Sequence, residues 1–282
     1  MYSTLISTAP LAAHIDDPSF VIVDVRHDLA QPERWGEDAY QLGHLPGARF
    51  AHIDRDLSAP RTWRNGRHPL PDAEACARVF GRLGIDATKE VVAYDQGAGM
   101  YAARLWWMLR SLGHEAAAVL DGGFAAWTRE ARPLTTEIPE FRETSFVAHG
   151  LPATVEAPAI AANLSTPSFV LLDARARERY RGDVEPLDPV AGHIPGARNR
   201  PYLDNLAPDG RFKPAADLAT EFDALLAGRA AKDVVHYCGS GVTACHNLLA
   251  MTHAGRPGAR LYPGSWSEWC SDPQRPVGRG DA

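Results

Sequence analysis

An internal repeat constrains the fold of this chain more than any other feature. Residues 20–26 read FVIVDVR, and residues 169–175 read FVLLDAR. The motif GHLPGAR begins 17 residues after the first segment ends, and GHIPGAR begins 17 residues after the second. Two further pairs follow in the same order, VVAYD with VVHYC and LDGGFAAW with LYPGSWSEW. Matched motifs at one spacing indicate a tandem duplication, so the 282 residues are expected to form two similar domains.

The repeat also gives the expected domain boundaries. We predict an N-terminal domain over residues 1–138, a linker over 139–156 and a C-terminal domain over 157–282. The linker is rich in proline and polar residues, which is typical of a connecting segment.

Each half alternates short apolar runs with helical patterns. FVIVDV, VVAY, FVLLD and DVVHY have the composition of buried strands. Residues 72–83, 101–112 and 215–227 have the pattern of helices. This alternation predicts an α/β fold in each domain, a parallel sheet with helices on both faces. Ligands of such sheets bind beyond the carboxyl ends of the strands.

Composition and charge exclude several functions. The chain is 45% hydrophobic and 23% charged, with a formal net charge of -6, so nothing favours binding to nucleic acid or to an anionic membrane. No apolar run approaches the roughly 20 residues of a membrane span. The first residues lack the basic start and long apolar run of a signal peptide. A cytoplasmic protein is therefore expected.

The four cysteines are too few for a disulfide scaffold and show no CxxC spacing, so we expect reduced thiols and no structural zinc site. Cys76 is expected in a helix core, Cys245 as a small buried helix residue, and Cys270 without a role. Cys238 stands apart because it follows a predicted strand directly.

The loop YCGSGVTAC, residues 237–245, favours a reactive cysteine. Gly239 and Gly241 allow backbone N–H groups to point inward, and a helix is expected to begin near Val242 or Thr243. The helix N-terminus adds partial positive charge, which stabilises a thiolate and an anion developing at its sulfur. The alternative is a buried apolar cysteine at a strand end.

In these motifs the chain resembles the two-domain sulfurtransferases of the rhodanese superfamily. The paired GH[LI]PGA motifs, DGGFAAW and GSWSEW carry the resemblance, which extends over about residues 5–275. In that family the C-terminal domain holds the cysteine. Asp95 stands at the matching place of the first half and cannot carry sulfane sulfur, so the first domain is expected to be catalytically silent.

The resemblance also implies a substrate and a proton-transfer group. The loop CGSGVT is similar to that of 3-mercaptopyruvate sulfurtransferases, and it lacks the basic residues that suit the dianion thiosulfate. The resemblance assigns Ser240, His68 and Asp54 to protonating the enolate that remains when sulfur departs. Without the resemblance, His68 is expected to be a solvated loop residue.

A substrate carboxylate needs a fixed cation, which an arginine can provide. The resemblance assigns this role to Arg179, beside the loop residues Gly239, Gly241, Val242 and Thr243. A second arginine is expected just after Glu-Pro, but Leu187 stands there. Arg200 is a candidate replacement.

The expected mechanism is a double displacement through a Cys238 persulfide, with cyanide, a small thiol or reduced thioredoxin as acceptor and with neither metal nor organic cofactor. Three alternatives remain. Thiosulfate:cyanide sulfurtransferase is favoured by Leu187, and a non-enzymatic binding module or sulfur carrier needs an assay to exclude it. A cysteine phosphatase needs arginine six residues after the cysteine, where Ala244 stands.

Overall fold

The computed structural model describes residues 1–149 and 153–281. These residues form two compact units. The first comprises Met1–Ala59, Pro71–Pro152 and Pro208–Arg211, and the second comprises Pro60–Leu70, Ala153–Ala207 and Phe212–Ala282. Within the described ranges, no helix is long and apolar enough to cross a membrane.

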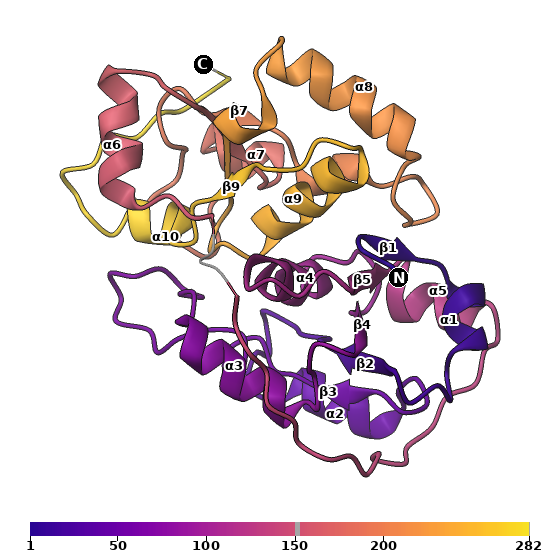
Figure 1. The fold of residues 1–282 in the computed structure, drawn as a ribbon. Helices are drawn as coiled ribbons and strands as arrows, with labels where there is room; N and C mark the ends of the chain where they lie inside the picture. The colour runs from indigo at the N-terminus through magenta and orange to yellow at the C-terminus, as the bar shows by residue number, and fades with distance from the viewer. Residues whose placement is uncertain (150–152, 282) are drawn as a thin grey trace. The chain divides into compact units, whose positions relative to one another are not determined.

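The first unit is built on a five-stranded parallel sheet with the order β1-β5-β4-β2-β3 (Figure 1). Its strands are β1 (Leu5–Ile6), β2 (Phe20–Asp24), β3 (Arg49–Phe50), β4 (Glu90–Tyr94) and β5 (Ala117–Leu120). Its helices are α1 (Thr8–Ala13), α2 (Trp35–Leu42), α3 (Ala73–Arg82), α4 (Ala102–Ser111) and α5 (Gly123–Arg129).

Apolar side chains cover both faces of this sheet. Leu11 of α1 and the fully buried Trp127 of α5 pack in one cluster with Val92 and Tyr94 of β4. Successive strand residues point to opposite faces, so the alternate β4 residues face the other side, where α4 contacts β4 and β5. Helices on both faces explain why the strand sequences are almost continuously apolar.

The second unit contains a four-stranded parallel sheet with the order β7-β6-β8-β9. Its strands are β6 (Val170–Asp173), β7 (Arg198–Asn199), β8 (Val234–Tyr237) and β9 (Arg260–Leu261). Its α-helices are α6 (Ala157–Ser165), α7 (Arg177–Arg181), α8 (Ala215–Leu226), α9 (Thr243–His253) and α10 (Ser265–Trp269), with short 3-10 helices at Tyr202–Asn205 and Ala231–Asp233. The order matches β3-β2-β4-β5, so the predicted duplication and α/β class are confirmed.

The repeated motifs make the same contacts in both units. The His44 ring stacks on Tyr40, and the His193 ring stacks on Tyr180, each with ring centroids 3.9 Å apart. In each pair the histidine Nδ1 also lies within hydrogen-bond distance of the tyrosine carbonyl oxygen, at 2.7 and 2.8 Å. These histidines therefore shape turns, as the presence of one in each half predicts.

The aspartates that end the repeated strands also hold neighbouring loops. Asp24, the last residue of β2, accepts hydrogen bonds from Arg26 and from the Tyr94 hydroxyl. Asp173, the last residue of β6, likewise binds the buried Arg175 side chain. Both carboxylates are fully buried and tie adjacent strand ends together, which is a structural role.

The segment proposed as a linker, 139–156, is partly attached to the first unit. The Thr144 N–H donates to Gly81 O, and the His149 N–H donates to Leu112 O. Residues 150–152 of this segment lie outside the described residues. In addition, the stretch Pro60–Leu70, which comes from the first half of the sequence, packs within the second unit. That placement positions His68 and its neighbour Arg67.

Candidate active site

Cys238 follows the last residue of β8, at the carboxyl end of the second sheet. Its side chain is buried, with 1% of the residue exposed. The Gly241 N–H donates to Cys238 Sγ at 3.1 Å, so the loop backbone turns a donor onto the sulfur. The helix α9 begins at Thr243, with Val242 as its N-cap, as the sequence predicts. Its N-terminal partial charge adds to the positive potential around the loop.

Backbone contacts fix the shape of this loop. Gly241 has a φ of +79°, and a Cβ there would approach Pro263 O to 2.4 Å, so only glycine fits without a shift. The Cys238 N–H donates to Ser265 Oγ at 3.1 Å. The Cys238 and Gly239 carbonyls accept hydrogen bonds from the first turn of α10. The repeated GSWSEW motif therefore forms the support of the cysteine loop.

The equivalent loop of the first unit shows what such a loop can bind. Asp95 follows β4 and is buried, and its carboxylate accepts hydrogen bonds from four backbone N–H groups at 2.9–3.4 Å. These donors belong to Gly97, Gly99, Tyr101 and Ala102. Burial raises the pKa of Asp95, whereas the four backbone hydrogen bonds act to lower it. The loop of the first unit thus encloses a carboxyl group with inward-pointing backbone donors.

Ser240 and His68 lie together in the second unit. His68 Nδ1 is hydrogen-bonded to Ser240 Oγ at 2.7 Å, and both residues are 6% exposed. Ser240 stands two residues after Cys238 in the loop. His68 is therefore buried beside the cysteine loop and is not the solvated loop histidine that its local sequence alone would predict.

Asp54, the third member of the expected proton-transfer group, belongs to the first unit. Its place beside His68 stays a prediction. Within its own unit, Asp54 lies in a group with His27 and His52 whose candidate ligand atoms are all within 4.8 Å of one another. Both ring nitrogens of His52 face the backbone, Nε2 at 2.9 Å from Pro32 O and Nδ1 accepting the Asp54 N–H at 3.0 Å. Because both ring nitrogens of His52 are hydrogen-bonded to the backbone, neither is available as a metal ligand. The three residues therefore do not fit a metal centre.

Two guanidinium groups lie against Gly239, the residue directly after Cys238. A Cβ at Gly239 would be 2.7 Å from Arg67 Nη2 and 3.5 Å from both Nη atoms of Arg179. Arg179 is also held by Glu185, with Nη2 2.6 Å from Oε1. Arg179 therefore lies beside the residue that follows Cys238, and its role as a substrate-binding cation stays a prediction. The lack of basic residues in the loop itself does not leave the loop without positive charge, because other segments supply it.

The two other positions considered for a substrate cation behave differently. Leu187 is 41% exposed, and its N–H donates to Glu185 Oε1 at 3.1 Å. Arg200 binds Glu221 at 2.6 Å and Asn205 at 3.0 Å. Arg200 is therefore committed to a local polar network, and its suggested role as replacement is not supported.

Sequence reasoning missed Arg67, Asp188 and Ser265. Arg67 precedes His68 directly, but its local sequence does not indicate that its side chain lies against Gly239. Asp188, whose Oδ1 accepts a hydrogen bond from Arg67 Nη1, lies in no motif of the sequence. Ser265 lies in the repeated GSWSEW motif. The repeat alone does not show whether a residue of this motif holds the cysteine loop in place or takes part in the reaction.

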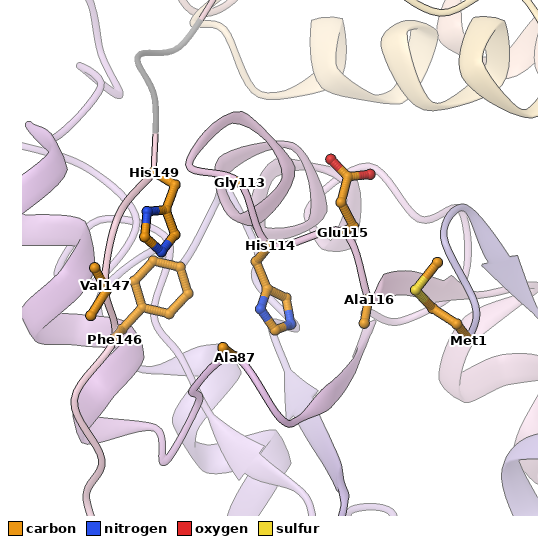
Figure 2. Close-up of a pocket in the computed structure, with 9 residues that line it drawn as sticks. All are labelled: Met1, Ala87, Gly113, His114, Glu115, Ala116, Phe146, Val147 and His149. Atoms are coloured by element: carbon orange, nitrogen blue, oxygen red, sulfur yellow. The ribbon is translucent and has the colours of Figure 1, made fainter.

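A separate cavity of about 230 Å³ lies in the first unit (Figure 2). Its lining consists of Met1, Ala87, Gly113, His114, Glu115, Ala116, Phe146, Val147 and His149. None of these nine residues is a cysteine, arginine or lysine, so no thiol and no side chain with a permanent positive charge lines the cavity. Burial lowers the pKa of His114, which favours its neutral form there.

Comparison with known proteins identifies a family, close relatives and solved structures that are similar to this chain. The model of the rhodanese-like domain matches residues 7–130 and 156–272. A Pseudomonas aeruginosa protein, "Probable 3-mercaptopyruvate sulfurtransferase", is 48% identical over 282 residues, 98% of each chain. A mouse thiosulfate sulfurtransferase is 35% identical over 285 residues, 95% of this chain and 92% of the relative. The crystal structure of SseA from Escherichia coli, a 3-mercaptopyruvate sulfotransferase, matches with a TM-score of 0.80 and 34% identity over 94% of this chain and 99% of that one.

Proposed function

Because this chain belongs to the rhodanese-like family, we propose that it is a sulfurtransferase that moves a sulfur atom from 3-mercaptopyruvate to a thiophilic acceptor through Cys238. The observation that carries the proposal is the loop in which Gly241 donates its N–H to Cys238 Sγ, with Ser240 and His68 hydrogen-bonded beside it.

In the first half of the reaction, the Cys238 thiolate attacks the sulfur of 3-mercaptopyruvate. The new S–S bond forms as the C3–S bond breaks, and its electron pair leaves as the enolate of pyruvate. The Ser240 hydroxyl donates a proton to that carbon, and His68 returns a proton to Ser240, with Asp54 proposed to orient the histidine. The products are pyruvate and a Cys238 persulfide.

The loop backbone supports the intermediate. The outer sulfur of a persulfide carries negative charge when deprotonated, and inward N–H groups stabilise such a charge. The Asp95 loop of the first unit supports this reading, since a loop at the equivalent sheet position closes four N–H donors on a carboxylate. On this account the first unit is silent because Asp95 offers no sulfur to transfer.

In the second half, a nucleophilic acceptor attacks the outer sulfur and Cys238 leaves as thiolate. Cyanide accepts the sulfur to give thiocyanate in an assay, and a small thiol or reduced thioredoxin is the proposed acceptor in the cell. The four cysteines are free thiols in the structure, and we keep the cytoplasm as the proposed compartment.

Thiosulfate is the second candidate donor. Leu187 in place of a carboxylate-binding arginine favours it, and so does the presence of two guanidinium groups beside Gly239, since thiosulfate is a dianion. The Ser240–His68 pair favours 3-mercaptopyruvate, because an enolate must be protonated whereas the sulfite released from thiosulfate is a stable anion.

Initial rates with each donor, with cyanide as acceptor, test the proposal. We expect kcat/KM for 3-mercaptopyruvate to exceed that for thiosulfate by about tenfold or more, and Cys238→Ser to abolish both reactions. A preference for thiosulfate would assign the alternative donor. Failure of the wild-type protein with both donors would favour a non-enzymatic binding module.

A further inference from the structure

We propose that Arg61, Trp63 and Arg64 form a docking surface for the protein that accepts the sulfur, and that this acceptor presents its thiol on an acidic surface. These residues belong to the stretch 61–64, called the basic tip below. The inference rests on the proposed function and names a class of partner for its second half. None of the three side chains takes part in the proposed mechanism.

Trp63 is exposed to an extent that is unusual for a tryptophan. Its exposed fraction is 73%, whereas Trp127, Trp266 and Trp269 are fully buried. Tryptophan is enriched among the residues that contribute most to protein interfaces, because it buries a large apolar surface while its indole N–H can still find a partner. An exposed tryptophan is therefore a candidate contact for a partner protein.

The backbone at Trp63 is also strained. Its φ is +68°, in the left-handed region that bulky residues rarely adopt. Glycine adopts such a φ freely, so a turn of this shape does not require a tryptophan. Strained residues gather at functional sites, where the surrounding structure imposes them. The stability of the loop therefore does not explain why a tryptophan stands here.

Local contacts hold the basic tip in one conformation. The Thr62 N–H donates to Asn65 Oδ1 at 2.8 Å, and Asn65 Nδ2 donates to Pro60 O at 3.1 Å. The Arg61 guanidinium lies over the Trp63 ring, with its Cζ 3.8 Å from the ring centroid. A surface that is already ordered loses less conformational entropy when a partner binds to it.

The basic tip is positively charged although the chain as a whole is acidic. Residues 57–71 contain three arginines and no aspartate or glutamate, whereas the formal net charge of the chain is -6. Arg67 is paired with Asp188, and Arg61 and Arg64 are exposed. Opposite charges on two proteins speed their encounter and select the partner. The basic tip therefore fits an acidic protein surface.

The base of the same segment lies at the cysteine loop. The Arg67 N–H donates to Ser267 Oγ at 3.0 Å, which joins the segment to α10. The next residue, His68, is hydrogen-bonded to Ser240 at 2.7 Å. Arg64 precedes His68 by four residues, which span at most about 14 Å of extended chain. A partner on the basic tip is therefore close to the place of sulfur transfer, which favours the sulfur acceptor as that partner.

The transfer to such a partner needs no further reactant. The acceptor thiolate attacks the outer sulfur of the Cys238 persulfide. An S–S bond to the acceptor forms as the S–S bond to Cys238 breaks, and Cys238 leaves as thiolate. The acceptor then carries the persulfide, so the step involves neither an external oxidant nor an external reductant.

Acceptor peptides that differ in charge test the proposal. The peptides have one length, one cysteine and one leucine, and the cysteine is flanked by aspartates, by serines or by lysines. With 3-mercaptopyruvate as donor, mass spectrometry measures the persulfide formed on each peptide, and cyanide serves as the small acceptor. Fluorescence anisotropy measures binding of a labelled aspartate peptide whose cysteine is replaced by serine, so this readout does not depend on turnover.

Two variants change the basic tip, and each has a matched control. Trp63→Gly removes the indole, and Arg64→Glu reverses a charge. Leu42→Ala changes an apolar side chain of α2 that is 84% exposed, and Arg34→Glu reverses the charge of an arginine whose side chain is 84% exposed. Both control positions belong to the first unit.

For the wild type we expect kcat/KM to fall from the aspartate to the serine to the lysine peptide, about tenfold in all, with a smaller range in about 0.5 M salt. Arg64→Glu should remove this order. Trp63→Gly should lower kcat/KM for every peptide about fivefold or more and weaken binding of the labelled peptide. Cyanide rates should change by less than about twofold. Urea unfolding should show no loss of stability in Trp63→Gly, because glycine relieves the strained φ.

Other outcomes overturn the inference. Equal losses with cyanide and with the peptides would make the basic tip a structural support of the cysteine loop. Wild-type rates that do not depend on peptide charge, or the same loss in Arg34→Glu as in Arg64→Glu, would contradict a docking surface at this place. A wild-type dimer that Trp63→Gly dissociates would assign the tip to a second copy of the chain. If the wild type transfers no sulfur to cyanide, the proposed function fails, and the anisotropy measurement still decides whether the tip binds an acidic chain.

Discussion

His68 Nδ1 lies 2.7 Å from Ser240 Oγ although 172 residues separate them in the sequence. Both side chains are buried, so the hydrogen bond is protected from competing water. The pair stands at the loop that carries Cys238, and the proposed mechanism assigns it the protonation of the carbon from which sulfur departs. This relationship leads to the most specific kinetic prediction of the account.

Replacing Ser240 with alanine should harm one donor far more than the other. The enolate from 3-mercaptopyruvate needs a proton, so we expect kcat with this donor to fall about 100-fold. Sulfite leaves thiosulfate without a proton, so any thiosulfate activity should change by less than about threefold. Steady-state rates with both donors measure the difference.

The control for this experiment is Ser165→Ala, at the exposed end of α6, which should leave both rates unchanged. His68→Asn should reproduce the donor-dependent loss of Ser240→Ala. Equal losses with the two donors would show that the pair supports the loop structure and does not move a proton.

Gly241 should be intolerant of any side chain. Gly241→Ala combines a strained φ of +79° with a Cβ 2.4 Å from Pro263 O, so the N–H that reaches Cys238 Sγ must move. We expect loss of most sulfurtransferase activity and a fall of more than about 2 kcal/mol in the free energy of unfolding.

Gly255→Ala separates the effect of backbone strain at a positive φ from the effect of a steric clash of the new Cβ. Gly255 has a similar φ of +72°, but a Cβ there would meet nothing within 4 Å. We expect it to cost about 1 kcal/mol of stability with full activity. Urea unfolding and rate measurements on both variants test this, and an equal effect of the two substitutions would refute the crowding argument.

Asp95 is predicted to matter for stability and not for sulfur transfer. Asp95→Ala leaves three buried N–H groups and the half-buried Gly97 N–H of its loop without their acceptor, so the free energy of unfolding should fall by about 3 kcal/mol. At a temperature where the variant is folded, kcat/KM should equal that of the wild type. A large loss of kcat/KM in the folded variant would show that the first unit takes part in the reaction.

His236 should make the protein less stable in mild acid. It is fully buried in β8, and burial, with a contribution from the Arg200 charge, lowers its pKa to about 3. The unfolded chain has the ordinary histidine pKa near 6.5, so it binds a proton below that pH while the folded protein does not. The contribution of His236 to the free energy of unfolding is therefore fully present above about pH 6.5 and declines as the pH falls toward 3. At pH 5 the loss amounts to about 2 kcal/mol.

Urea unfolding of the wild type and His236→Leu, at about pH 7.5 and about pH 5, measures this contribution. The leucine variant should lose less stability between the two conditions, because its remaining titrating groups are shared with the wild type. If both proteins lose the same stability between the two pH values, the acid sensitivity does not arise from His236. That result would contradict the prediction.

The sequence predicted those parts of the structure that depend on local patterns and on the repeat. The apolar runs correspond to β2, β4, β6 and β8 of the structure. The glycine pattern after Tyr237 correctly predicted the cysteine loop and the start of α9. The repeated GH[LI]PGA motifs place His44 and His193 at matching positions, where the two histidines make matching contacts.

Contacts made by the segment 60–70 could not be predicted in this way. No local pattern shows that this stretch of the first half packs within the second unit, yet it brings His68 to Ser240 and Arg67 to Gly239. His68 was named only through the family resemblance, and Arg67 was not named at all. Charge at the loop was underestimated because it comes from distant residues and not from the loop sequence.

The central claim is that Cys238 carries the transferred sulfur, and the mass of the intact protein tests it most directly. After incubation with 3-mercaptopyruvate and no acceptor, the wild type should gain the mass of one sulfur atom, located on the peptide containing Cys238, and should lose it on addition of cyanide. Cys238→Ser should gain nothing, while Cys245→Ser should behave as the wild type. A sulfur adduct that persists in Cys238→Ser, or turnover without any adduct in the wild type, would contradict the account.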